Sequence, residues 1–275
     1  EKTRYYPSMF IGPSSKTLHI ENLVDHDQQY PISIRKNYTV TDKADGERRL
    51  MYVADDGKIY LITTNMTIQF TGMRTKTKSC INSLVDGEYI ATDKNGNPLS
   101  MFACFDIYAI QKKDVRHMPF MRTKETEKDF KTDRFTMMSE MFQVLNPSNI
   151  TNKDNIHDMS FVVKKFYPVY SNKDEENIPT IFQSIIHLDE AIQNGKYIYN
   201  TDGHILTPIH YGVGSMEIGK AGPSKKITWD ASFKNKPLAY TTIDFLATTL
   251  KDKHGHDVVS SVMEDGENMT KMVQV

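Results

Sequence analysis

The chain has 275 residues, 39% of them hydrophobic and 25% charged, which is typical of a globular protein with one large or two modest domains. Its formal net charge of −1 excludes binding to nucleic acid through a general excess of basic residues, so local basic clusters would be needed. The two cysteines, Cys80 and Cys104, form no CxxC pair and have no histidines at ligand spacing. This argues against a zinc site or a disulfide framework and favours a reducing, intracellular compartment. No apolar run reaches the roughly 18 residues of a membrane span, so no membrane partner is expected.

Strand patterns dominate roughly the first hundred residues. Two turns interrupt them, Asp55–Asp56–Gly57 and Asn95–Gly96, and both are strong hairpin signals because Asp-Gly and Asn-Gly pairs accept positive φ angles. The pattern predicts a twisted antiparallel sheet with strands at 38–43, 49–53, 58–64, 88–91 and 99–110.

Apolar residues at a spacing of three to four predict two amphipathic helices in the second half. The first covers 135–145 and ends before Asn146–Pro147, and the second covers 181–192 and is closed by Asn194–Gly195. The methionines of the first helix are expected to pack in the core. Further elements follow in chain order: strands at 159–170 and 198–209, a glycine-rich loop at 212–222, and a short helix near 242–250.

The stretch TDKADGERRLMYV, residues 41–53, carries unusual charge for an extended segment. A period of two places Lys43 and Asp45 on one face, and Gly46 allows a bend that turns Arg48 toward that face. Partial burial beside another cation disfavours the ammonium form of Lys43, which leaves a neutral amine able to attack an electrophile such as phosphorus. The alternative, from these residues alone, is a surface strand whose charges are solvated.

Further motifs follow in order: LVDGEY (84–89), MFACFDIY (101–108), VVKKFYP (162–168), TDGHILTP (201–208) and FKNKP (233–237). With KADGER, which fits the nucleophile pattern KxDGxR, they resemble the covalent nucleotidyltransferases over residues 38–246. That superfamily contains DNA ligases, RNA ligases and mRNA capping guanylyltransferases. The resemblance implies an α+β fold: a nucleotidyltransferase domain, similar to ATP-grasp and DNA ligase domains, of twisted, mainly antiparallel sheets flanked by helices.

Two details distinguish the branches of this superfamily. In the motif that TDGHIL resembles, ligases usually carry glutamate where this chain has Asp202, and the aspartate is similar to that of the capping guanylyltransferases. The proline after KNK points to the same branch. The run ASFKNKPLAYTTIDFL is most similar to capping enzymes of large cytoplasmic DNA viruses, where this domain lies within a longer multifunctional polypeptide. A cytoplasmic location, in a viral factory or virion if the chain is viral, is therefore expected.

The resemblance implies a two-step reaction. Lys43 would attack the α-phosphate of GTP, and the resulting lysyl-GMP would be transferred to the 5′-diphosphate end of an RNA to form a GpppN cap. Lys234 and Lys236, which a period of two places on one strand face, would contact phosphates. Asp202 would hold Mg²⁺ or Mn²⁺, with Glu88 either a further ligand or a partner of the ribose hydroxyls.

The same resemblance assigns nucleoside contacts. Arg48 would reach the sugar or phosphate, Phe105 would stack on the base, and Lys164 would donate to guanine O6, which favours GTP over ATP. Lys164 and Lys165 carry the same group, and alternation sends them to opposite faces, so the pattern does not separate them. In FKNKP, Asn235 stands between the two lysines, where the family often has an aromatic or aliphatic residue.

The expected layout is an N-terminal extension packed on the domain (1–37), a nucleotidyltransferase domain (38–250) and the start of a linker toward an OB-fold lid (251–275). The chain begins without methionine and ends in MVQV, so we expect a fragment whose full polypeptide also carries the lid, a triphosphatase and a methyltransferase. No RxDK lid motif follows Pro237, so GMP transfer to Lys43 should be slow or absent without the lid. Two alternatives remain: an ATP-dependent polynucleotide ligase domain, and a non-catalytic scaffold that binds nucleotide.

Overall fold

The computed structural model describes residues 5–25, 32–151, 158–170, 178–237, 248–260, 270–271 and 273–274. Its contacts divide the chain into two compact units, Glu1–Pro237 and Leu238–Val275. The predicted functional residues all belong to the first unit.

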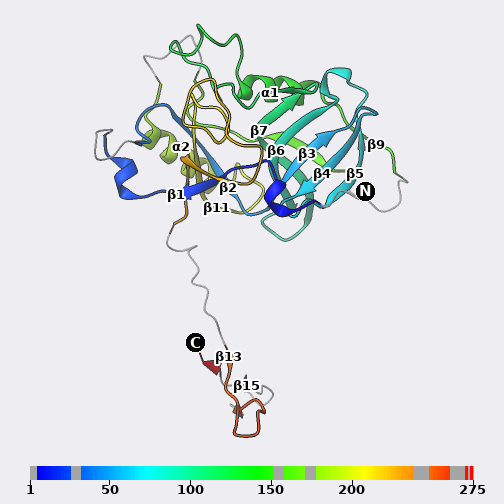
Figure 1. Ribbon diagram of the computed structural model, residues 1–275, viewed down its shortest axis with the longest axis vertical. Helices are drawn as coiled ribbons and strands as arrows, with labels where there is room; N and C mark the ends of the chain where they lie inside the picture. Colours follow the sequence, from blue (N-terminus) through cyan, green and yellow to red (C-terminus); the bar gives the residue numbers. More distant parts are fainter. Residues whose placement is uncertain are drawn as a thin grey trace. The chain divides into compact units, whose positions relative to one another are not determined.

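The described part of the first unit is built on a sheet of eight strands and a sheet of four (Figure 1). The larger sheet has the order β10 (Ser160–Val163), β7 (Pro98–Ile110), β6 (Ser83–Thr92), β3 (Glu47–Val53), β4 (Lys58–Thr63), β5 (Ile68–Arg74) and β9 (Ser148–Asn149), with β8 (Lys113–Asp114) paired to β7. The smaller sheet has the order β1 (Ser14–Thr17), β12 (Thr228–Asn235), β11 (Thr201–Pro208) and β2 (Tyr38–Ala44). Pairs β1–β12 and β10–β7 are parallel, and the other described pairs in these sheets are antiparallel. The predicted α+β fold with mainly antiparallel sheets is confirmed.

Both predicted amphipathic helices are present, and one packs on each sheet. Helix α1 (Arg134–Val144) contacts β7 and β10 of the larger sheet, and α2 (Ile181–Gln193) contacts β2 of the smaller one. α1 begins where the Asp133 carboxylate accepts the Thr136 N–H. α2 begins with a capping box of Thr180 and Gln183. Short 3₁₀ turns complete the unit: η1 (Pro7–Met9), η2 (Ile20–Leu23) and η3 (Lys78–Cys80).

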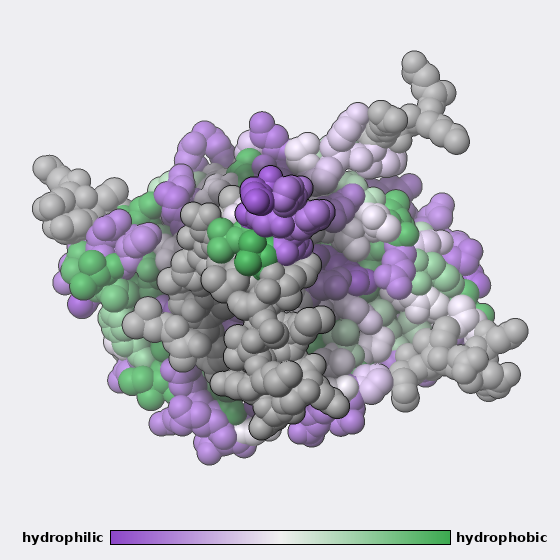
Figure 2. Space-filling view, turned by 90° about the horizontal axis from the view of Figure 1, so that it is seen from below, coloured by the Kyte–Doolittle hydropathy of each residue, from purple (hydrophilic) through white to green (hydrophobic). Residues whose placement is uncertain are grey.

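In the face shown in Figure 2, purple, hydrophilic residues are interspersed with green patches of hydrophobic residues. Among the described residues, no helix is long and apolar enough to span a membrane.

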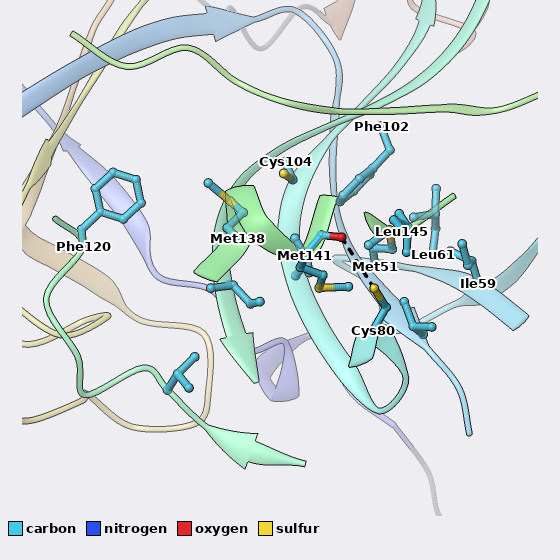
Figure 3. Close-up of a cluster of buried hydrophobic side chains, with 14 of the residues drawn as sticks. Met51, Ile59, Leu61, Cys80, Phe102, Cys104, Phe120, Met138, Met141 and Leu145 are labelled. Carbon is cyan, nitrogen blue, oxygen red and sulfur yellow. Dashed lines mark hydrogen bonds between the residues drawn. The ribbon is translucent and has the colours of Figure 1, made fainter. Parts of the chain in front are cut away.

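A sulfur-rich core lies between α1 and the larger sheet (Figure 3). Met138 and Met141 of α1 are buried against Met51 of β3, which confirms that these methionines are packing residues. Cys80 and Cys104 are free and buried, and the Cys80 thiol lies 3.6 Å from the Met141 carbonyl oxygen. A second core under α2 contains Ile34, Val40, Leu188, Leu206 and Phe233.

Two predicted elements differ from the structure. The strand predicted at 159–170 is limited to β10, because the chain after Val163 turns from β7 toward β2, where Tyr167 forms an isolated bridge with Val40. The helix predicted near 242–250 falls mainly outside the described residues, and its end is wrong: Thr248–Thr249 forms strand β13, paired with β16 (Val273–Gln274). β-branched threonines favour such extended pairing. The second unit also contains β14 (Val259–Ser260) paired with β15 (Thr270–Lys271).

Candidate active site

The charged stretch KADGER is a corner between the two sheets and not one extended strand. β2 of the smaller sheet ends at Ala44, the chain bends at Asp45–Gly46, and β3 of the larger sheet begins at Glu47. A Cβ on Gly46 would lie 2.7 Å from the Tyr89 carbonyl oxygen, so the tight corner requires glycine. Lys43 and Arg48 consequently approach one pocket from two different sheets.

The pocket between the sheets has a volume of about 240 Å³. The smaller sheet contributes Ser14, Ser15, Thr41, Lys43, Ala44, Ile205, Thr207, Trp229, Ser232 and Lys234. The larger sheet and the segments next to it contribute Arg48, Glu88, Phe105, Asp106, Tyr108, Lys164 and Phe166. Six of the eight predicted site residues therefore line one pocket, although they come from distant parts of the sequence. A larger hollow of about 590 Å³ lies elsewhere, beside Arg35, Lys36 and His210, and contains none of them.

The remaining two residues, Asp202 and Lys236, are joined to the pocket through Lys43. Lys43 Nζ lies 2.6 Å from Asp202 Oδ1, and Lys236 Nζ lies 3.3 Å from Asp202 Oδ2. The backbone after Asp202 can pass this close to β12 because Gly203 has φ +138° and a Cβ there would meet the Asn235 carbonyl oxygen at 2.0 Å. Lys43 thus forms an ion pair with a carboxylate, whereas the sequence had suggested a cation as its neighbour.

Arg48 is held by buried groups of the larger sheet. Its Nε and Nη2 donate to the two oxygens of Asp86, at 3.1 and 2.5 Å, and the Tyr108 hydroxyl also donates to Asp86. Its Nη1 donates to the Pro13 carbonyl oxygen at 2.8 Å. Burial alone would lower the pKa of the Arg48 guanidinium, but the charge of Asp86 and the hydrogen bonds outweigh it and raise the pKa.

Glu88 is half-buried opposite Arg48 on the neighbouring strand β6. Desolvation raises its pKa to about 7, although the charges of Lys164, Arg48 and Lys43 act against the shift. The carboxyl group therefore titrates near neutral pH, as groups at functional sites often do.

Phe105 lies on β7 beside Arg48, whose guanidinium carbon is 5.6 Å from the centre of the ring. The next residue, Asp106, forms a buried two-bond pair with Arg134, with distances of 2.8 and 3.1 Å. Burial raises the pKa of Asp106, and Arg134 acts against this. This pair fixes β7 to the start of α1, so it supports the site structurally.

The structure distinguishes the two neighbouring lysines of VVKKFYP. Lys164 is buried in the pocket wall, where its Nζ donates to the Asp42 carbonyl oxygen at 2.5 Å and lies 3.0 Å from Asp42 Oδ2. Lys165 is exposed. Because Asp42 belongs to β2 and Lys164 follows β10, this pair also ties the two sheets together at the pocket.

The two lysines of FKNKP do not share a strand face as predicted. β12 ends at Asn235, so Lys234 lies in the strand and lines the pocket, whereas Lys236 follows the strand and reaches Asp202. Lys234 therefore lines the pocket directly, whereas Lys236 is linked to it through the carboxylate that also pairs with Lys43. Asp45 lies exposed at the corner and does not line the pocket, contrary to the expected shared face with Lys43.

Several residues that line the pocket or lie beneath it were not predicted from the sequence. Asp86 and Tyr108 lie inside the recognised motifs, so their presence there was a usable signal. Pro13, Ser15 and Trp229 lie outside every motif, and the sequence offered no signal for them.

The acidic residues suit a divalent cation that is bound together with substrate. Among the described residues, no group of three or more His, Cys, Asp or Glu side chains could hold a metal. Mg²⁺ is commonly bound through one or two carboxylates plus substrate phosphates and water. Asp202 between two lysines fits that role, with Glu88 as a second carboxylate in the pocket wall.

Two facing sheets that bring the lysine of KxDGxR together with arginine, glutamate and further lysines define a nucleotidyltransferase domain. The sequence pattern of the family described as "mRNA capping enzyme, catalytic domain" matches residues 32–215. The chain therefore belongs to the family of mRNA capping enzyme catalytic domains, which confirms the predicted enzyme class.

Individual proteins show more distant similarity. The chain is 26% identical over 279 residues to a "Probable mRNA-capping enzyme" of Acanthamoeba polyphaga mimivirus. The match covers 92% of this chain and 23% of that protein, so the chain spans about a quarter of the relative's length. The ligase domain of LigD from M. tuberculosis matches with a TM-score of 0.46 and 11% identity, over 82% of this chain and 59% of that one. A mycobacterial DNA ligase D complexed with ATP and MES matches with a TM-score of 0.42 and 12% identity, over 82% and 60% of the two chains.

Proposed function

We propose that this domain is an RNA guanylyltransferase that carries GMP on Lys43 and transfers it to the 5′-diphosphate end of an RNA. The observation that supports this most directly is the position of Lys43. Lys43 lines a pocket to which Phe105 and Lys234 also contribute, and its amine shares the Asp202 carboxylate with Lys236. A triphosphate placed along the lysines would present its α-phosphate to Lys43.

In the first step, the Lys43 nitrogen attacks the α-phosphorus of GTP. An N–P bond forms, the bond from that phosphorus to the bridging oxygen breaks, and pyrophosphate leaves with the electron pair. The amine must lose a proton first, and the Asp202 carboxylate at 2.6 Å is within reach to accept it. Lys234 and Lys236 stabilise the charge that develops on the phosphate oxygens. Mg²⁺ or Mn²⁺ held by Asp202 would supply further charge neutralisation.

In the second step, a β-phosphate oxygen of the RNA end attacks the same phosphorus. The N–P bond breaks, the amine of Lys43 is regenerated, and the product carries a GpppN cap. The same cations serve both steps because both transition states place charge on the same phosphate.

The larger sheet would select the nucleoside. The Phe105 ring is available for stacking on the base, and Glu88 can accept hydrogen bonds from ribose hydroxyls. Lys164 has three N–H donors, of which one donates to the Asp42 carbonyl oxygen, and its ammonium also forms an ion pair with Asp42, so a donor remains for an acceptor such as guanine O6. Adenine carries a donor amine at that position, which would favour GTP over ATP.

The wider polypeptide is part of the proposal. We infer that an OB-fold lid follows this domain and that triphosphatase and methyltransferase activities accompany it, as in capping polypeptides. A location in the cytoplasm, in a viral factory or virion, fits the viral relative.

Incubation with α-labelled GTP or ATP and Mg²⁺ tests the proposal. We expect a covalent, acid-labile label from GTP and none in Lys43→Ala, with Lys165→Ala as a matched control that labels normally. Labelling should be weak in this chain and rise in a chain extended through the lid. Preferential labelling by ATP would support the ligase alternative, and nucleotide binding without a label in the extended chain would support the scaffold alternative.

A further inference from the structure

A short N-terminal segment lies outside the residues matched by the family, yet it forms part of the pocket wall. Pro13, Ser14 and Ser15 line the pocket, whereas the match begins at residue 32. β1 pairs in parallel with β12, and Ser15 Oγ lies 2.7 Å from Ser232 Oγ. The segment is therefore built into the same sheet that carries Lys43 and Lys234.

This segment also holds Arg48. The Pro13 carbonyl oxygen accepts from Nη1, and the buried Phe10 ring has its centre 5.7 Å from the guanidinium carbon. Gly12 leaves no spare room, since a Cβ there would lie 2.9 Å from Arg48 Nη2 and 2.6 Å from Phe10 Cε1. The N-terminal segment thus contacts the Arg48 guanidinium through a backbone oxygen and an aromatic ring, in addition to the two hydrogen bonds to Asp86.

These contacts restrict how Arg48 can point. A guanidinium has five N–H groups. Asp86 and Pro13 take three of them and Nη2 also contacts the Tyr108 hydroxyl at 3.5 Å, which leaves one for a ligand. The Phe10 and Phe105 rings lie at similar distances from its carbon, 5.7 and 5.6 Å. Such cation–π contacts add orientation as well as attraction.

We propose that Phe10, Gly12 and Pro13 are positioning residues of the nucleotide site, which hold Arg48 ready to bind the sugar or phosphate of the nucleotide. This inference rests on the proposed function for the identity of the ligand. It places the beginning of the functional domain at about residue 10, well before the boundary at residue 38 expected from the motifs.

Binding measurements on Phe10→Leu and Gly12→Ala test this inference. Both variants should weaken GTP binding in Mg²⁺, measured by titration calorimetry, by about threefold to thirtyfold, the range expected for a lost cation–π contact. Phe142→Leu is the matched control, because Phe142 is half-buried on α1 and packs against the main core. It should lower the melting temperature but leave the dissociation constant for GTP within about twofold of wild type.

A double-mutant cycle separates positioning from general damage. In an Arg48→Lys background, which keeps the charge but loses the planar group, Phe10→Leu should change GTP affinity less than about 1.5-fold. An equal effect of Phe10→Leu in both backgrounds would overturn the inference, as would normal binding by both single variants.

A readout without nucleotide keeps this result distinct from a failure of the proposed function. Solvent exchange of the Arg48 Nε–H, followed by ¹⁵N NMR, should be slow in the wild type and faster in Phe10→Leu. Unchanged exchange would overturn the positioning role even if GTP labels the protein. Faster exchange would support it even if the wild type prefers ATP, in which case the cycle is repeated with ATP.

Discussion

The two sheets contribute walls of different character to the pocket. On the small-sheet wall, the Lys43, Lys236 and Asp202 side chains remain 28%, 38% and 17% exposed. On the large-sheet wall, Asp86 is fully buried beneath Arg48, and the Lys164 side chain, which follows β10, is 4% exposed. The first wall carries accessible charges on flexible stems, and the second carries charges fixed by buried partners.

This difference matches what each wall would bind. A phosphate chain moves and changes charge during reaction, so lysines on long, rotatable stems suit it. A base and sugar need recognition in one geometry, and a guanidinium held by two bonds to a fully buried carboxylate supplies that rigidity. The Lys43–Asp202 pair would be exchanged for contacts to phosphate and metal, whereas the Arg48–Asp86 pair would persist.

The largest expected effect separates two aspartates, one on each wall. Asp86→Asn should lower the free energy of unfolding by about 3 kcal/mol, because Arg48 and Tyr108 lose a buried carboxylate. Asp202→Asn should change it by less than about 1 kcal/mol, because both of its partners reach solvent. Urea unfolding followed by circular dichroism measures both values.

Of these two aspartate substitutions, the one with the smaller effect on stability should have the larger effect on activity. Asp202→Asn should remain folded and lose labelling by GTP, since the proposed metal contact and the ion pair with Lys43 are lost. Equal destabilisation by the two substitutions would contradict the distinction between a fixed wall and an accessible one.

The ordered motifs of the sequence identified residues that the structure brings together at one pocket. Lys43, Arg48, Glu88 and Lys234 all line the pocket as expected. The sequence indicated a bend at Gly46 but not that the chain changes sheets there, because a period-two pattern continues through the corner. A pattern of local alternation reports which face a side chain takes, but not to which sheet the strand belongs.

Long-range contacts account for the other differences. Asp202 neighbours Lys43 because β11 pairs with β2 across more than 150 positions of the sequence, with a register shift near Gly203. Phe10 and Pro13 contact Arg48 although no motif surrounds them. β5 was also missed, since its first three residues are exposed and give no clear apolar alternation.

A smaller effect concerns nucleotide choice on the large-sheet wall. Lys164→Met should reduce the preference for GTP over ATP by about tenfold, the size of a lost hydrogen bond to a charged group. Dissociation constants for both nucleotides measure this, and the exposed Lys165→Met serves as the matched control.

Lys164→Met also leaves Asp42 buried without its partner, so stability must be treated separately. Adding Asp42→Asn should restore much of the lost stability but not the preference for GTP. Recovery of selectivity in the double variant would show that the loss came from distortion and not from the missing donor.

The smallest effect is a pH dependence from Glu88. Because burial raises its pKa from the ordinary 4.5 to about 7, the folded state binds this proton more tightly than the unfolded state does. Its favourable contribution is therefore complete below the unfolded pKa and is lost as pH rises through the folded pKa. Between about pH 6 and pH 8, the free energy of unfolding should fall by about 1 kcal/mol from this group.

Glu88→Gln removes the titration while keeping the shape, so its stability should exceed that of the wild type more at pH 8 than at pH 6. Paired urea denaturations at the two pH values measure the difference, with Glu47→Gln, an exposed glutamate on β3, as control. An identical pH slope in Glu88→Gln and wild type would mean that Glu88 is well solvated. The large-sheet wall would then be as open as the small-sheet wall at this point, and the ribose would meet an accessible carboxylate instead of one held in place by its surroundings.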